Sequence, residues 1–239
     1  MKNHKDSDYY RTLLLRTIGN FMIFSSFFMI GKTFYEPVKA EFRYLIDSQK
    51  DKQYIVASTK EEAVAAGYTF TTGDIGKKGS LGSAIDRNVE VMIPTNSDFG
   101  IVVPKIAANA PVIANVDTSD KDQYLKALKN GVAHAAGTAF PGEGGHIYLF
   151  AHSTDNIWNV GTYNAVFYLL YKLEIGDEIN LFYKGERIIY KVAGKEIINP
   201  DEVEYLTRKT DRETLTLQTC WPPGTTLKRQ IIFAERVVE

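Results

Sequence analysis

The chain has 239 residues, of which 44% are hydrophobic and 24% charged, enough to bury one sizeable core with a small appendage. Its 28 lysines and arginines and 29 aspartates and glutamates are spread along the sequence and leave a formal net charge of -1. The basic residues are not clustered into a positively charged surface that would attract phosphates, so the charge pattern argues against nucleic acid as a partner.

Residues 13–31 are predicted to form a membrane helix. This stretch is apolar except for Arg16, and from Thr17 onward it carries no charge. At 1.5 Å per residue its length is ~28 Å, close to the ~30 Å hydrocarbon thickness of a bilayer. Arg16 and Lys32 can snorkel to the two interfaces.

Two other interpretations of this segment are open. A buried core helix is disfavoured because the segment is apolar all round and not along one stripe. A cleaved signal peptide is also compatible, because Val38-Lys39-Ala40 is a passable small-residue cleavage site. Basic residues slightly favour a cytoplasmic N-terminus. We therefore expect a single-pass protein of the cell membrane, with a cytoplasmic tail (1–12), a transmembrane signal anchor (13–35) and an extracytoplasmic C-terminal domain.

Beyond the helix, residues 36–95 mix short helical patterns with the loop-like "TTGDIGKKGSLGS" and are predicted to form a partly structured stalk or linker. From 96 to 239 short β-branched runs alternate with Gly, Pro, Asp or Asn, which predicts a mainly β domain, an antiparallel barrel or sandwich. Two helices should interrupt it, at 120–134 and 162–174. Lys184-Gly185 between two alternating runs predicts a hairpin.

Cys220 is the single cysteine and so cannot form an intrachain disulfide. It is a packed thiol, an intermolecular crosslink or a reactive group. A nucleophilic thiol needs a partner to trade a proton, because only a few per cent of a free thiol is ionised at neutral pH. His152 ends a predicted strand and enters a polar loop, where barrels expose working side chains. His146 shares its strand parity near the opposite end, His134 falls in the loop "GVAHAAGTAFPGEGG", and His4 precedes the membrane helix.

If the thiol attacks a carbonyl group in an acyl transfer, an oxyanion develops, and a hydrogen-bond donor such as a backbone amide or an arginine must stabilise it. Arg229 lies nine residues after Cys220, just before the run "QIIFAERVV". If the intervening "WPPGTTL" turns the chain back antiparallel, Arg229 comes to lie near Cys220. A solvated arginine at the barrel rim is the plain alternative, and Lys228 is a rival cation beside it.

These residues together resemble a sortase, one of the membrane-anchored cysteine transpeptidases of monoderm bacteria. "TLQTC" (216–220) matches the T-L-x-T-C signature, and "CWPPGTTLKR" resembles the family's cysteine with its proline-containing loop and trailing arginine. "GVAHAAGTAFPGEGGHIYLFAHS" resembles the strand that leads to the catalytic histidine. The resemblance covers roughly residues 98–238. His146 stands where the family often has Asn, and Ala151 where it often has Gly.

The resemblance implies a closed eight-stranded β-barrel with short helices. Cys220 would attack the threonine carbonyl of an LPxTG-like sorting signal and form a thioester, with His152 as acid and base and Arg229 holding substrate and oxyanion. The partners implied are proteins that bear this signal and an acceptor amine, from a cell-wall precursor or a pilin lysine. The enzyme would anchor proteins to the wall or polymerise pilins.

The short span from Cys220 to Arg229 favours the smaller class D or E type of sortase. No cofactor or metal is expected, since the acidic stretches "SDKDQY" and "DEVEYL" read as solvated loops or helix faces. The substrate-binding residues are not identified from the sequence. The alternative function is a non-catalytic, membrane-tethered β-barrel binding protein in which Cys220 is a small buried hydrophobe.

Overall fold

The computed structural model describes residues 3–68, 81–83, 89–153 and 166–238, and the chain divides into two compact units, 1–40 and 41–239. Helix α1 (Asn3–Gln49) begins in the first unit and ends in the second. Its segment Asp8–Lys32, with a mean hydropathy of 1.6 and no buried residues in its apolar window, is long and apolar enough to cross a membrane.

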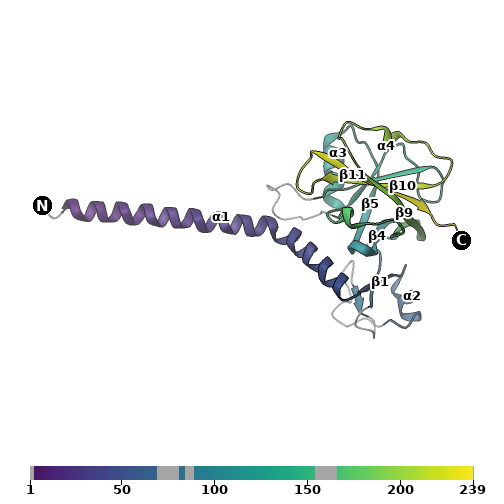
Figure 1. Ribbon diagram of the computed structural model, residues 1–239, viewed down its shortest axis with the longest axis horizontal. Coiled ribbons are helices and arrows are strands. Elements are labelled where there is room, and N and C mark those ends of the chain that lie inside the picture. The colour runs from purple at the N-terminus through teal and green to yellow at the C-terminus, as the bar shows by residue number, and fades with distance from the viewer. Residues whose placement is uncertain (1–2, 69–80, 84–88, 154–165, 239) are drawn as a thin grey trace. The chain divides into compact units, whose positions relative to one another are not determined.

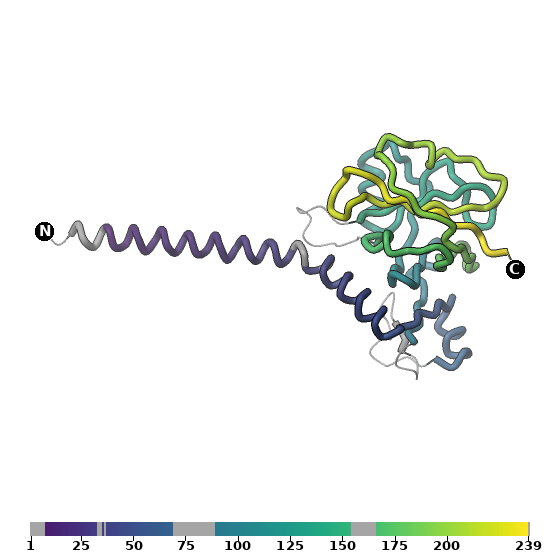
Figure 2. The backbone as a smooth tube through the Cα atoms, in the orientation of Figure 1, coloured from purple at the N-terminus to yellow at the C-terminus, as the bar shows by residue number. Residues whose placement is uncertain are grey.

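The second unit contains a closed barrel of eight strands, as expected from the sortase resemblance. The order around the barrel is β10-β11-β9-β8-β4-β5-β6-β7. Strands β5 and β6 are parallel, as are β7 and β10, and the other neighbours are antiparallel. The strands are β4 (Phe99–Val103), β5 (Ala108–Val116), β6 (Val132–Ala135), β7 (His146–Phe150), β8 (Glu178–Tyr183), β9 (Glu186–Ile198), β10 (Thr214–Trp221) and β11 (Lys228–Arg236). Figures 1 and 2 show the C-terminal strands lying beside the teal strands from the middle of the chain.

The barrel core reflects period-2 alternation. On β7 and β10, Ile147, Leu149, Leu215 and Leu217 are fully buried, and each burial of this kind contributes about 1.5–3 kcal/mol. The residues between them, such as Gln218, point away from the barrel interior. These alternate positions therefore form the outer face of β7, β10 and β11.

The predicted hairpin is confirmed. Strands β8 and β9 pair up to Tyr183 and Glu186 and leave a two-residue turn, Lys184-Gly185. Both turn residues have positive φ, 52° and 84°, which is the requirement of the turn type that matches strand twist.

The first predicted helix is shorter than expected. Helix α3 (Lys121–Asn130) is capped by Asp120, whose side chain accepts hydrogen bonds from the first turn, and ends before Gly131. The chain then forms β6, parallel to β5, and α3 is the crossover that such a pair requires; it lies against both strands. The expectation that His134 belongs to a loop is therefore wrong, because this residue lies in β6.

The second predicted helix is only partly within the described residues, since 162–165 lie outside them. Residues 166–169 form turns, and only the short 3-10 helix η3 (Leu170–Lys172) comes after them. The helix prediction is wrong over this part. Leu169, Leu170 and Leu173 are nevertheless buried, because a tight turn can place neighbouring apolar side chains against the same core.

The stretch 36–95 contains regular structure. Besides the end of α1 it forms α2 (Lys60–Ala65) and a three-stranded sheet of β1 (Gln53–Val56), β3 (Val89–Met92) and β2 (Leu81–Ser83), in that order. Val56 and Met92 of this sheet pack with Val102 and Phe182 of the barrel. In addition, Arg187 of β9 donates a hydrogen bond to the Val56 carbonyl at 2.8 Å. The described part of this stretch is thus attached to β4, β8 and β9.

Candidate active site

Cys220 is the penultimate residue of β10. Its side chain is half-buried and forms no disulfide. Burial raises the pKa of this thiol above its ordinary value, and the positive charge of Arg229 acts in the opposite direction. The site therefore needs a proton acceptor and a nearby cation if the thiol is to react at neutral pH.

Arg229 lies directly opposite Cys220. Strands β10 and β11 are antiparallel, with Cys220 paired to Arg229 and Trp221 paired to Lys228. Directly paired residues place their side chains on the same face of a sheet, so Arg229 shares the face of the thiol and Lys228 does not. The Arg229 Nη1 donates hydrogen bonds to the carbonyls of Thr226 and Lys228 at 3.1 and 3.0 Å, which hold the guanidinium over the β10–β11 connection.

His152 comes after β7, on the other side of β10. The parallel register pairs Phe150 with Gln218. The contact continues beyond the strand, because the Ala151 N–H donates to the Gln218 carbonyl at 3.1 Å and the Thr219 hydroxyl donates to the Ala151 carbonyl at 2.9 Å. Because the strands are parallel, counting two residues on from the Phe150–Gln218 pair along each chain segment gives His152 and Cys220, which are therefore neighbours across this pairing. The neighbouring ends of β7, β10 and β11 thus carry the histidine, the cysteine and the arginine.

The backbone before His152 is ordinary. Glycine at position 151 would suggest a positive φ, but among the described residues the non-glycine positions with positive φ are Asp51, Ala107, Asn115 and Lys184. Ala151 is not one of them, and it is buried. The departure from the family's usual glycine therefore introduces no backbone strain here.

The other histidines of the barrel have structural partners. His134 is fully buried; its Nδ1 accepts from the Asn115 N–H at 3.2 Å and its Nε2 lies 3.0 Å from the Thr138 hydroxyl. His146, also buried, contacts the Thr216 hydroxyl through Nε2 at 2.8 Å. Burial lowers the pKa of both imidazoles. His4 lies in α1, before the apolar segment.

In the direction away from Cys220 along β10, the outer-face side chains are Gln218 and then Thr216; we call them the outer-face row. Gln218 comes first, and its Oε1 accepts a hydrogen bond from the Tyr148 hydroxyl at 2.5 Å. Burial raises the pKa of Tyr148, while Arg229 acts to lower it. Sequence reasoning missed Tyr148, although its parity on β7 is that of His146 and His152.

The row ends in a cavity of about 230 Å³, to which outer-face residues of β10 and β11 contribute. Arg208, from the connection between β9 and β10, adds a positive charge to its lining. The full lining consists of Ala193, Gly194, Arg208, Thr214, Leu215, Thr216, Phe233, Ala234 and Glu235.

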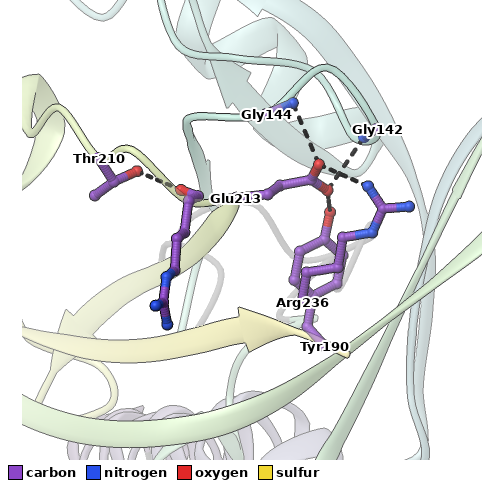
Figure 3. Close-up of polar contacts among 7 residues, drawn as sticks. Gly142, Gly144, Tyr190, Thr210, Glu213 and Arg236 are labelled. Carbon is purple, nitrogen blue, oxygen red and sulfur yellow. Dashed lines mark hydrogen bonds and ion pairs between the residues drawn. The ribbon is translucent and has the colours of Figure 1, made fainter. Parts of the chain in front are cut away.

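The loop that enters β7 is fixed by the carboxylate of Glu213 (Figure 3). This carboxylate accepts hydrogen bonds from the Gly142 and Gly144 N–H groups at 3.1 and 3.3 Å. The Tyr190 hydroxyl also donates to it, and Arg236 forms an ion pair with it at 3.0 Å. The "PGEGG" segment is thereby tied to β9 and β11, which fixes the loop at the start of β7.

Within residues 3–68, 81–83, 89–153 and 166–238, no group of three or more His, Cys, Asp or Glu side chains is placed to hold a metal ion. In the acidic stretch "SDKDQY", Asp120 caps α3. Asp117, just before it, accepts hydrogen bonds from the Ser119 hydroxyl at 2.7 Å and the Ser119 N–H at 2.8 Å, which lower the pKa of its carboxyl group.

Comparison with known proteins identifies the family of this chain. The model of the Sortase domain matches residues 101–237, more than half of the chain. The chain belongs to the sortase family, whose members are cysteine transpeptidases that act on sorting signals.

Individual relatives carry the same family name. The chain is 30% identical over 147 residues to Sortase D of Bacillus subtilis (strain 168), a match that covers 60% of this chain and 66% of the relative. Among solved structures, sortase C-1 from Actinomyces oris is 29% identical with a TM-score of 0.49, covering 59% of this chain and 73% of that one. A lid mutant of sortase A from Corynebacterium diphtheriae is 26% identical with a TM-score of 0.49, covering 60% and 72%.

Proposed function

We propose that this chain is a sortase-type cysteine transpeptidase that cleaves an LPxTG-like sorting signal after Thr and transfers the acyl group to an amine. The observation that carries the proposal is the strand register. It pairs Cys220 with Arg229 and, by continuation of the β7–β10 pairing, brings His152 to the other side of Cys220. A nucleophile, a proton carrier and a cation therefore occupy adjacent strand ends.

The reaction would proceed in two steps. In the first, His152 takes the proton of the Cys220 thiol, the sulfur attacks the threonine carbonyl carbon, the bond to the next residue breaks, and His152 passes the proton to the departing amine. In the second, His152 takes a proton from the incoming amine, which attacks the thioester and releases the thiol. Arg229 stabilises the oxyanion of both tetrahedral intermediates; to do so its guanidinium must donate to the substrate oxygen as well as to the loop carbonyls.

The outer-face row supports an extended peptide substrate. Thr216, in the cavity wall, lies four residues from Cys220, a span of ~13 Å at strand spacing. An extended peptide covers this distance with about four residues, the length of the signal up to the scissile bond. We propose that the substrate residues upstream of the cleaved bond bind along this row, with Gln218 packed against the peptide and Arg208 at the end of the row that lies away from Cys220.

The apolar part of α1 supports membrane attachment. We propose residues 13–35 as a single-pass anchor of the cell membrane, with 1–12 in the cytoplasm and the barrel, 96–239, outside. The stretch 36–95 then joins the anchor to the barrel. Sorting-signal proteins and a cell-wall precursor or pilin amine would be the partners on that side.

Mass spectrometry tests the proposal. The full chain, in detergent, is incubated with LPxTG-like peptides and trapped at acid pH. We expect an adduct on Cys220 with the mass of the peptide cut after Thr, released by an added primary amine. Cys220→Ala should lose the adduct entirely and His152→Ala should lose turnover, whereas the neighbouring Lys228→Ala should retain both. An inert thiol and no adduct with any peptide would instead favour the non-catalytic binding protein.

A further inference from the structure

The end of α1 is joined to the barrel unit by the carboxylate of Glu41. The Tyr171 hydroxyl donates a hydrogen bond to Glu41 Oε1, and Lys172 Nζ lies 3.4 Å from Glu41 Oε2. Lys172 Nζ also lies over the rings of Tyr44 and Tyr171, 5.1 and 4.9 Å from their centroids. The side chains of Glu41 and Lys172 are only 29% and 26% exposed, so this is a partly desolvated contact.

A second set of contacts holds the same helix segment to the small sheet. The Tyr54 hydroxyl of β1 donates to Asp47 Oδ2 at 2.5 Å and accepts from Arg43 Nη2 at 3.2 Å. Lys52 Nζ lies 3.8 Å from Asp47 Oδ1. The end of α1 is therefore fixed through two different sets of side chains, and Glu41 can be changed without releasing the helix from the sheet.

Tyr171 connects this contact to the strand that carries the thiol. Its ring packs on Trp221, with ring centroids 5.1 Å apart and an angle of 54° between planes. The backbone of Tyr171 is fixed by its neighbours. Leu170 and Leu173 are fully buried, and Lys195 Nζ donates a hydrogen bond to the Tyr171 carbonyl at 3.3 Å. The ring is thus held both by its own segment and by Glu41.

Trp221 is the residue directly after Cys220 and the last of β10. Strand alternation places its side chain on the opposite face from the thiol. A ring fixed on that face restricts the backbone of Cys220 without contacting anything bound at the thiol.

We propose that Glu41 and Tyr171 are positioning residues for Cys220, acting through the ring of Trp221. The inference rests on the proposed function, because it takes Cys220 as the nucleophile. Since neither residue lies on the outer-face row, they should affect the rate of the chemical step and not the binding of the peptide. Reacting groups held within a fraction of an ångström favour reaction, so loosening this backing should lower kcat with little change in KM.

The test uses the full chain in detergent with Trp158→Phe, which leaves Trp221 as the sole tryptophan; Trp158 itself lies outside the described residues. In this background, Glu41→Ala and Tyr171→Leu should shift Trp221 emission to the red, raise its quenching by acrylamide and lower kcat about tenfold. Tyr171→Phe keeps the ring and should retain most of the Trp221 signal. Glu61→Ala, an exposed change in α2, is the matched control.

The outcomes separate the two proposals. Unchanged emission and quenching in both Glu41→Ala and Tyr171→Leu, or changed emission with unchanged kcat, overturns the positioning role. A fall in kcat together with the emission shift supports it. If the wild-type chain transfers no acyl group, the proposed function fails; emission and the rate of Cys220 alkylation by iodoacetamide then decide the coupling alone.

Discussion

Cys220 and Arg229 are directly paired across β10 and β11, so a partly buried thiol and a guanidinium share one face. Burial raises the pKa of the thiol and the arginine lowers it, which makes the charge at position 229 a control on the thiolate fraction.

The first prediction concerns thiol reactivity. Replacing Arg229 by Ala removes the charge that opposes burial, so the pKa of Cys220 should rise further and the pH profile of its alkylation should move to higher pH. Iodoacetamide modification, monitored by intact mass from pH 6 to 10, measures this. Lys228→Ala should leave the profile in place, because Lys228 is paired with Trp221 and its Nζ donates to Asn199 at 3.1 Å. Coincident profiles for wild type and Arg229→Ala would contradict the electrostatic role.

A second prediction is that Arg229→Lys is not conservative. An ammonium keeps the charge but does not reproduce the planar fork of donors at a carbonyl oxygen. We expect a loss in kcat on the order of 10², the typical effect of removing one oxyanion donor. Peptide cleavage kinetics measure it, with Lys228→Arg as control. Full activity in Arg229→Lys would transfer the role to backbone amides or another arginine.

The barrel could be predicted largely because its long strands alternate clearly. The runs that became β7 to β11 were all visible in the sequence, and the hairpin at Lys184-Gly185 was signalled by its turn chemistry. Strand β6 was missed because "VAHA" is short, is separated from α3 by Gly131 alone, and has low β-propensity at its alanines. It is a strand because β5 and β7 supply its partners, and that information is not local.

Part of the candidate site, the pairing of Cys220 with Arg229, could also be predicted from a local pattern in the sequence. The eight residues between Cys220 and Arg229 contain Pro-Pro-Gly, so the pairing of Cys220 with Arg229 could be expected from a tight return of the chain. The partners of Glu41 could not be found this way. Its contact with Tyr171 joins positions 130 residues apart, and nothing in the local pattern of either segment indicates it.

The third prediction concerns stability at mildly acid pH. Burial, assisted by the charge of Arg208, lowers the pKa of His146 to about 4 from an unfolded value of about 6.5. The unfolded chain therefore binds this proton first as pH falls. The stability contributed by neutral His146 is complete above pH 6.5 and is lost progressively towards pH 4, by about 2–3 kcal/mol.

Substitution by Asn isolates this effect. His146→Asn cannot titrate and still offers a partner to the Thr216 hydroxyl, so the mutant should lose less stability than wild type between pH 6.5 and pH 4. Urea unfolding at each pH gives the comparison. His134, whose pKa is lowered in the same direction, contributes equally to both chains and cancels. Parallel curves for the two chains would show that His146 is not neutral in the folded state.

The last prediction separates stability from chemistry at Glu213. This carboxylate joins the Gly142–Gly144 loop to Tyr190 and Arg236 (Figure 3), and its side chain is only 6% exposed. Glu213→Ala leaves two loop N–H groups and a guanidinium without this acceptor, which should cost about 2–3 kcal/mol of unfolding free energy. Glu235→Ala, an exposed carboxylate on β11, should cost less than about 0.5 kcal/mol.

Because the network lies at the start of β7, far along the strand from His152, the folded Glu213→Ala chain should still alkylate at Cys220 with the wild-type pH profile. A destabilised mutant with an altered thiol profile would mean that the loop before β7 also sets the geometry at its other end.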